Sequence, residues 1–506
     1  FISNNSFLDQ IAFDGMRKHL VHDFHRIYHL NLQGNVRQNP KLSGTAYNVF
    51  GIQVGVGITI AVRHSGVRSG IFCHAVPLDW RRHKKLDWLR EQRDLRSVPW
   101  QELTPDTRHT WLVPEHASEF AGFVSIGQKK GKGVPADSVF DLFTNGVKTN
   151  RDDWMYDFSQ DALAEKVERF IETYNTEVDR WKRRKDRDAK VDDFVTYDDR
   201  RIKWSRDLKL DLVRGNYAAF DDAKIRECLY RPFTKRRLFF DSILNEEIYS
   251  LERLFPAPTT DRDNSAICAT AIGSEKPFMA LLSNVVTDVH LVGAGCGSQC
   301  FPLFTYSSDA QHRRENITDW ALTQFREHYQ DLRITKTQIF HYVYALLHHP
   351  DYRARFADNL KRELPRIPFA PHFDAFADAG FRLARLHLDY EQLEPYPLEF
   401  FVNPGFSLSY RVEDKMRLAK DKRSLVVNPS LTLAGIPPDA FEYRLGNRSA
   451  PEWVIDQYQV TEAPRSGIRL DPNRPDDPEY IVRLLGQVIH VSLETLGIVR
   501  HLPAWQ

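Results

Sequence analysis

Two short stretches of the 506-residue chain combine side chains that can contact nucleic acid. The first follows a turn signal at Asn145 and Gly146 and presents, in succession, Lys148, Thr149, Asn150 and Arg151. Asparagine can form two hydrogen bonds with adenine, and arginine can form two with guanine. This stretch therefore predicts contact with a DNA groove or with the phosphate backbone.

The second stretch is YRPFTKRR at residues 230–237, where cations alternate with aromatic side chains. This pattern is typical of nucleic-acid binding, although solvated basic residues without a ligand are the alternative. Pro232 excludes a helix interior and favours a loop or a strand edge. The predicted contacts are Tyr230, Arg231, Lys235, Arg236 and Arg237.

Two further basic segments could meet a phosphate backbone. The segment 182–190 reads KRRKDRDAK, and the loop at 126–135 contains GQKKGKG. Runs of this kind are usually solvated, so both interpretations stay open at this point.

The cysteines and histidines give no metal site. Cys296 and Cys300 lie near His290, but no second cysteine pair follows, so buried small residues are expected and no metal is predicted. The odd number of cysteines, five, is typical of reduced thiols and predicts a cytoplasmic protein.

The bulk composition sets the remaining limits. The formal net charge is only +1, the hydrophobic fraction is 42%, and the length corresponds to about three domains. We see no apolar run of about 18 residues and therefore expect no membrane span.

The first 76 residues of the chain follow a strand–helix–strand–strand pattern. Strands are expected at residues 2–7, 26–32, 54–62 and 70–76, with a helix at 9–24. The strand 54–62 reads as fully buried, and 70–76 as an edge strand. Because so little chain precedes these strands, we expect the sheet to begin upstream of residue 1.

Longer helices dominate the rest of the chain. An amphipathic helix is predicted at 161–181, after a strand at 154–158. Further helices are predicted at 335–349, 351–364, 375–390, 450–457 and 478–496, with strands at 425–427 and 443–445. The predicted domains are 1–100, 101–330 (α+β), a helical block at 331–395, and 396–506 (α+β).

Residues 1–76 resemble the back half of a gamma-class adenine-N6 DNA methyltransferase domain. The resemblance rests on FISNNSFL, AFDGMRKHL and TAYNVFGIQVGVGITIAVR. It implies the remnant of a Rossmann-like α/β sheet, with Phe50 stacking on an adenine turned out of the duplex. The alternative for Phe50 is an ordinary core residue. The glycine-rich turn for S-adenosylmethionine and the Asn/Asp-Pro-Pro-aromatic motif are both missing from this sequence.

The remainder resembles the C-terminal region of type ISP restriction–modification enzymes. The resemblance follows the chain in order through GVKTNRDDW, RIKWSRDL, CLYRPFTKR, NITDWAL, LHLDYE and SGIRLDPN. It implies a mixed α+β target-recognition region that binds double-stranded DNA. It also implies upstream methyltransferase, helicase-like and nuclease domains on the same polypeptide. Pro451 departs from the aliphatic residue expected there and puts the start of the 450–457 helix in doubt.

Together these observations predict the C-terminal part of a site-specific adenine methyltransferase that uses S-adenosylmethionine. We expect the chain alone to bind DNA without catalysis. The alternative is a non-enzymatic specificity subunit that acts in trans with a separate methyltransferase. A third, weaker alternative is an interaction module whose basic loops bind no DNA.

Overall fold

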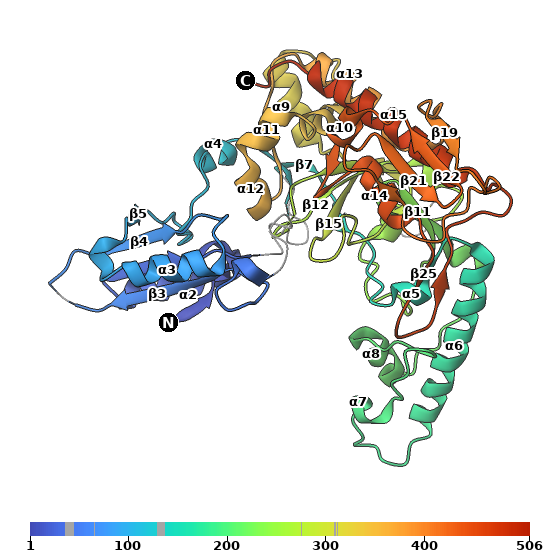
Figure 1. The fold of residues 1–506 in the computed structure, drawn as a ribbon, viewed down its shortest axis with the longest axis horizontal. Coiled ribbons are helices and arrows are strands. Elements are labelled where there is room, and N and C mark those ends of the chain that lie inside the picture. The colour runs from blue at the N-terminus through green and yellow to red at the C-terminus, as the bar shows by residue number, and fades with distance from the viewer. Residues whose placement is uncertain (36–44, 65, 129–136, 275, 308–309, 311) are drawn as a thin grey trace. The chain divides into compact units, whose positions relative to one another are not determined.

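The fold is that of a computed structural model of residues 1–506 (Figure 1). It describes every residue except 36–44, 65, 129–136, 275, 308–309 and 311. The chain forms two compact units: unit 1 contains Phe1–Gly122 and Asp358–Glu363, and unit 2 contains Phe123–Ala357 and Leu364–Gln506. The finer division predicted at residues 100, 330 and 395 stays a prediction.

Unit 1 is built on one five-stranded sheet with the order β1-β3-β2-β4-β5. β3 runs antiparallel to both β1 and β2, whereas β2 and β4 are parallel. β1 and β2 therefore point the same way, with β3 inserted between them. The strands are β1 (Ile2–Asn4), β2 (Arg26–Asn31), β3 (Val56–Val62), β4 (Gly70–Ala75) and β5 (Gln101–Leu103).

Helices cover both faces of this sheet because alternate residues of a strand point to opposite sides. Ile27 of β2 packs in a cluster with residues of α2 (Asp14–Asp23). Leu30, three positions further along β2, packs with residues of α3 (Arg82–Glu91). The short helices of unit 1 are α1 (Ser6–Asp9), α4 (Ala117–Ala121) and α12 (Ala357–Arg362), which belongs to this unit from Asp358 onward.

Four predictions for unit 1 need correction. The strand expected at 2–7 ends at Asn4, since α1 begins at Ser6, and the helix expected at 9–24 becomes η1 (Ile11–Phe13) and α2. The strand expected at the edge, β4, is internal because β5 pairs with it. β3 is not fully buried, since Ile60 is 40% exposed. A run of β-branched residues does not reveal which face is covered.

Unit 2 contains several small sheets. The two that carry the candidate site have the orders β14-β10-β11-β9 and β13-β12-β15-β8. Their strands are β8 (Thr144–Asn145), β9 (Tyr156–Asp157), β10 (Ile225–Arg231), β11 (Thr234–Phe239), β12 (Ala266–Thr270), β13 (Ala280–Ser283), β14 (Val286–Thr287) and β15 (Ser298–Pro302).

The other strands of unit 2 form smaller, separate groups. One sheet has the order β18-β6-β7 and another the order β19-β22-β21-β20, and three two-stranded ribbons complete the set. The strands are β6 (Val124–Gly127), β7 (Ser138–Phe140), β16 (Phe304–Tyr306), β17 (Arg313–Glu315), β18 (Arg366–Ile367), β19 (Glu399–Val402), β20 (Arg417–Leu418), β21 (Ser424–Asn428), β22 (Leu431–Ala434), β23 (Arg444–Leu445), β24 (Arg448–Ser449), β25 (Thr461–Glu462) and β26 (Arg469–Leu470).

The helices of unit 2 begin where local sequence signals place them. Ser159 caps the amphipathic helix α6, and Thr335 and Gln338 form a capping box at the start of α10. The helices are α5 (Asp152–Met155), α6 (Gln160–Lys182), α7 (Val191–Phe194), α8 (Arg206–Arg214), α9 (Asp319–Tyr329), α10 (Lys336–Leu346), α11 (Pro350–Arg355), α13 (Phe373–Leu388), α14 (Ala450–Gln457) and α15 (Tyr480–Arg500). The whole is a mixed α/β protein with several sheets and a helical block.

Helix α15 contradicts the expectation that the chain has no apolar run long enough to span a membrane. By length and hydropathy, Tyr480–Arg500 is the one helix of the described chain that could cross a membrane, contrary to the expectation that no such run exists. However, 67% of its apolar window is buried, against α13 and α14 among other elements. The core helix of a folded domain passes the same test.

Two further predictions for unit 2 are also revised. The strand expected at 154–158 is shortened to Tyr156 and Asp157, which pair with β11, because Trp154 and Met155 belong to α5. Pro451 does not disturb α14, since it stands in the first turn. A proline there lacks an N–H that would have no partner in the helix.

Candidate nucleic-acid interface

The two predicted contact stretches meet at one pocket of unit 2. This pocket encloses about 360 Å³ and lies where the turn before α5, the end of β10 and the segment after β14 converge. Its lining consists of Lys148, Thr149, Asn150, Asp152, Asp153, Lys203, Tyr230, Asp288, Val289 and His290. No local pattern predicts that Asn150 and Tyr230, 80 positions apart in the chain, line the same pocket.

Asn150 is the residue of the first stretch that faces outward. It is exposed, and its backbone adopts the left-handed conformation with φ of 56°. Asparagine tolerates this conformation better than most residues. In the described part of the chain, its side-chain amide has no hydrogen-bond partner, so its donor and acceptor groups are available to a ligand.

Unlike Asn150, Thr149 and Tyr230 are buried and hydrogen-bonded within the protein. Both donate hydrogen bonds to the carboxylate of Asp152, Thr149 from its hydroxyl and Tyr230 at 3.0 Å from its phenol. Thr149 is 1% exposed and Tyr230 is 8% exposed. Burial raises the pKa of Tyr230, so its hydroxyl remains a donor. These two residues fix the start of α5, which forms one wall of the pocket.

Asp288 organises the opposite wall. Its carboxylate accepts hydrogen bonds from Arg231 at 2.9 Å, from the Tyr156 hydroxyl at 2.8 Å and from the His290 backbone N–H at 2.7 Å. Burial raises the pKa of Asp288, and the guanidinium of Arg231 opposes that rise. The side chains of Arg231 and Asp288 are 11% and 3% exposed, so this is a desolvated ion pair.

The second stretch is a β-hairpin with Pro232 in its turn, where a loop or a strand edge was expected. Two of its three guanidinium groups lie over the Tyr230 ring, Arg231 at 3.8 Å and Arg236 at 3.9 Å from the centroid. Lys235 pairs with Glu227 at 3.1 Å and with Glu391 at 2.5 Å. The predicted DNA contacts Arg231, Lys235 and Arg236 are therefore held by internal partners, because the hairpin packs inside unit 2. Arg237 is half-buried.

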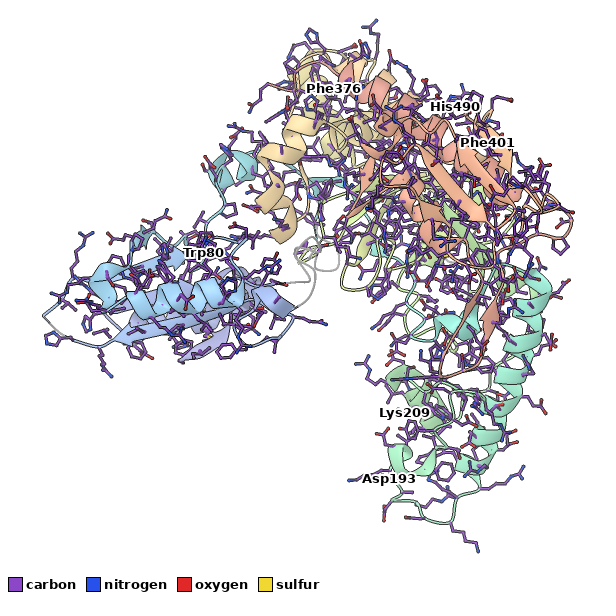
Figure 2. The ribbon with its side chains drawn as sticks, in the orientation of Figure 1. Trp80, Asp193, Lys209, Phe376, Phe401 and His490 are labelled. Carbon is purple, nitrogen blue, oxygen red and sulfur yellow. The ribbon has the colours of Figure 1, made fainter. Side chains whose placement is uncertain are left out.

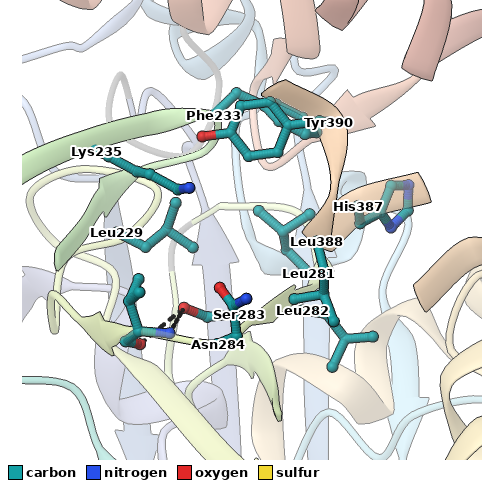
Figure 3. Close-up of a pocket in the computed structure, with 11 residues that line it drawn as sticks. Leu229, Phe233, Lys235, Leu281, Leu282, Ser283, Asn284, His387, Leu388 and Tyr390 are labelled. Atoms are coloured by element: carbon teal, nitrogen blue, oxygen red, sulfur yellow. Dashed lines mark hydrogen bonds between the residues drawn. The ribbon is translucent and has the colours of Figure 1, made fainter. Parts of the chain in front are cut away.

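Lys235 lines a different and much smaller cavity (Figure 3). In Figure 3, Lys235 and Leu229 lie on one side and His387 on the other, and the rings of Phe233 and Tyr390 lie together above them. The space holds only about 10 Å³. That is about the volume needed for a single water molecule, so this cavity cannot take a nucleotide.

Arg151 is the clearest departure from the sequence-based prediction. It is 0% exposed, and its guanidinium donates to the Lys203 carbonyl at 3.2 Å, to the Leu244 carbonyl and to the Ser205 hydroxyl. Burial lowers its pKa to about 10, with Glu246 opposing the change. In this structure Arg151 cannot reach a base, because three internal acceptors occupy its donors.

The remaining candidates lie elsewhere. Phe50 of unit 1 is 54% exposed, which excludes the core alternative, and it follows β2 in the turn that leads to β3. Asn48 holds this turn: its amide donates to the carbonyls of Gly34 and Val54, at 3.2 and 2.6 Å. In the predicted loop 126–135, residues 129–135 lie outside the described residues.

The described residues offer no group of three His, Cys, Asp or Glu side chains that could hold a metal ion. Cys296 and Cys300 are buried free thiols. His290 lies beside Cys296 only through its backbone carbonyl, at 3.4 Å from the ring nitrogen. The prediction that no metal binds stays a prediction.

Sequence reasoning missed Asp288, Lys203 and Asn48. A signal existed for Asp288, because a carboxylate in the apolar run VVTDVHLV must find a partner once the run is buried. Lys203 and Asn48 carried no such signal, since their roles depend on segments distant in the sequence.

Comparison with known proteins places these features in a family. The Type ISP C-terminal specificity domain matches residues 138–484. The solved structure of a nuclease-deletion mutant of the Type ISP restriction–modification enzyme LlaGI, in complex with a DNA substrate mimic, is 32% identical with a TM-score of 0.87. The DrdV–DNA complex is 34% identical, and the ATP-dependent Type ISP enzyme LlaBIII bound to DNA is 30% identical, both with a TM-score of 0.87.

These alignments cover 100% of this chain, but 46%, 50% and 32% of the LlaGI, DrdV and LlaBIII chains. The chain therefore spans half the length, or less, of the proteins it matches. No curated protein sequence matches it.

Proposed function

Because this chain belongs to the Type ISP restriction–modification enzymes and carries their C-terminal specificity domain, we propose that it recognises a sequence in double-stranded DNA. The observation that carries the proposal is the pocket at Asn150. It lies within the matched residues 138–484 and combines an unengaged amide with two lysines, Lys148 and Lys203. The relatives LlaGI, DrdV and LlaBIII were each solved with DNA or a DNA mimic.

The chemistry of the pocket suits the reading of base edges. A side-chain amide can accept from N6 and donate to N7 of adenine, and lysine can donate to O6 and N7 of guanine. The carboxylate of Asp288 is paired with the guanidinium of Arg231, and that of Asp152 accepts hydrogen bonds from Thr149 and Tyr230. We assign base contact to Asn150 and to Lys148, whose ammonium group has no ion pair in the described chain.

For the whole enzyme we propose methylation of an adenine at N6, with S-adenosylmethionine as the methyl donor. Unit 1 supports this with parallel strands β1, β2 and β4 and an exposed aromatic ring, Phe50, beyond the end of β2. An exposed ring can restore stacking to a base turned out of the duplex. This chain contains neither the glycine-rich turn nor the Pro-Pro-aromatic motif, so its residues do not fit the cofactor. No step of methyl transfer is assigned to them.

The alternative is a specificity subunit that acts in trans. The same pocket would serve it equally well. The first proposal is favoured because LlaGI, DrdV and LlaBIII, which align with the whole of this chain, are single chains of at least twice its length.

Selection from random duplexes tests sequence recognition. The 506-residue chain is bound to a pool of duplexes, and the retained DNA is sequenced. We expect one enriched sequence. The variant Asn150→Gly keeps the left-handed backbone and removes only the amide, so discrimination at one base position should fall by about 1–3 kcal/mol. Failure to enrich any sequence would contradict the proposal.

Methyl transfer has its own test. Sequencing of the native host genome should reveal N6-methyladenine within the enriched sequence. Unmodified adenines at those genomic sites would contradict methylation by the whole enzyme and leave DNA recognition standing.

A further inference from the structure

The turn at residues 198–203 is tied to the candidate site by its backbone. The indole N–H of Trp154 donates to the Asp199 carbonyl at 3.3 Å, and Arg151 donates to the Lys203 carbonyl at 3.2 Å. Asp198 and Ile202 pair across the turn, and Ile202 is 2% exposed. The main chain of this turn is therefore fixed against the segment that carries Asn150.

The side chains of the same turn are cationic and open to solvent. Arg200 and Arg201 are exposed, and Lys203 lines the pocket beside Lys148. None of the three cations of the turn has an ion pair in the part of the chain that the structure describes.

Neighbouring cations on α8 behave differently. Lys209, which Figure 2 labels, pairs with Asp192, and Arg206 pairs with Asp207 at 2.8 Å. The turn thus keeps a fixed backbone together with three cations that form no ion pair in the described chain, next to a pocket that also carries Lys148. Its own two carboxylates, Asp198 and Asp199, leave it a formal net charge of +1.

We infer that residues 198–203, here called the basic turn, bind the phosphate backbone of the DNA whose bases the pocket reads, and that Arg151 positions this turn. The inference rests on the proposed function and names the part of the ligand that it had not assigned. Phosphate contacts set the register of a protein on a duplex, whereas base contacts specify sequence. A cation adjoining the base-reading pocket is suited to set that register.

Arg151 fits the positioning role because its planar fork reaches three acceptors on two segments at once. Besides the Lys203 carbonyl, it donates to the carbonyl of Leu244 and to the hydroxyl of Ser205, which caps α8. Lysine has one ammonium group and cannot reproduce this geometry. Arg151→Lys should therefore release the basic turn while it keeps the charge.

The test measures the salt dependence of duplex binding. The 506-residue chain and the double variant Arg200→Ala/Arg201→Ala are titrated by fluorescence anisotropy. The probes are a 30-base-pair duplex of arbitrary sequence and one that contains the enriched sequence, over a series of salt concentrations. Each lost phosphate contact lowers the slope of log K against log salt by about 0.9, so we expect a fall of about two. Affinity for both duplexes should fall by the same factor, which leaves their ratio unchanged.

The control is Arg417→Ala/Lys420→Ala, which removes the same charge at and just beyond strand β20, away from the pocket lining. Its slope should stay within about half a unit of the original. Arg151→Lys should lower the slope although it leaves the net charge of the protein unchanged. A lower slope in this variant therefore cannot come from a loss of charge and must come from the displaced turn.

Two outcomes overturn the inference. One is a slope for the Arg200/Arg201 variant that equals the slope of the control. The other is a change in the affinity ratio, which would make these residues base readers. If the unmodified chain selects a sequence in either case, the proposed function survives. If it binds no duplex at all, the proposed function fails first.

Discussion

The buried ion pair of Arg231 and Asp288 allows a quantitative prediction. Replacing Asp288 by asparagine keeps the shape of the side chain and removes its charge. The guanidinium of Arg231 then stays in a site where it is 11% exposed, without a counter-charge. Removal of one partner of a buried pair costs about 3–5 kcal/mol, because the remaining charge is desolvated.

The structure offers a control pair with the same separation. Arg90 and Asp87 on α3 are also 2.9 Å apart, but their side chains are 78% and 59% exposed. Exposed pairs contribute about 0–1 kcal/mol, since water solvates both groups. Asp87→Asn should therefore have almost no effect, and the difference between the two variants isolates burial from distance.

Hydrogen exchange measured by mass spectrometry suits a protein with two units, because it reports local opening. We expect amides of β10 and β11 in Asp288→Asn to exchange roughly a hundredfold faster or more, since each 1.4 kcal/mol is a factor of ten. The double variant Arg231→Met/Asp288→Leu should recover much of the protection, because no charge is left buried. A loss of less than about 1 kcal/mol in Asp288→Asn would refute the view that this pair is desolvated.

Two further predictions concern the helical block. His348 is 3% exposed, and burial lowers its pKa from 6.5 to about 4, so between these values the unfolded chain takes up a proton that the folded chain does not. The free energy of unfolding should be highest above pH 6.5 and should fall as the pH drops. This residue alone should lower it by about 2 kcal/mol at pH 5. His348→Gln should reduce the difference between urea unfolding at pH 7 and at pH 5, and an unchanged difference would contradict the assignment. Gly380 of α13 lies so close to α10 that an added Cβ would meet the His341 carbonyl oxygen at 1.8 Å. Gly380→Ala should therefore lower the melting temperature. Gly497→Ala in α15, where an added Cβ meets nothing within 4 Å, should raise the melting temperature, because alanine is preferred over glycine in a helix by about 1 kcal/mol. Equal shifts for both would show that helix packing at Gly380 is loose.

Much of the secondary structure followed from local sequence signals. The predicted helix at 161–181 is α6 within one residue at each end, because its apolar spacing and the Ser159 cap act over a few residues. The predicted strand at 26–32 is β2, and the predicted helix at 450–457 is α14. Sheet order was not predictable, since pairings such as β10 with β14 join segments that are distant in the sequence.

The site divides in the same way. Local sequence is enough to pick out two stretches whose residue types suit contact with DNA, the turn with Lys148 and Asn150 and the basic aromatic stretch at 230–237. Which of these side chains face outward depends on how distant segments pack around them. Arg151 turns inward because Lys203, Leu244 and Ser205 surround it with acceptors, and Lys235 is paired with Glu391. A buried cation whose donors are taken up by internal acceptors is less available to a ligand, and the acceptors of Arg151 and the Glu391 partner of Lys235 lie more than 50 residues away in the sequence.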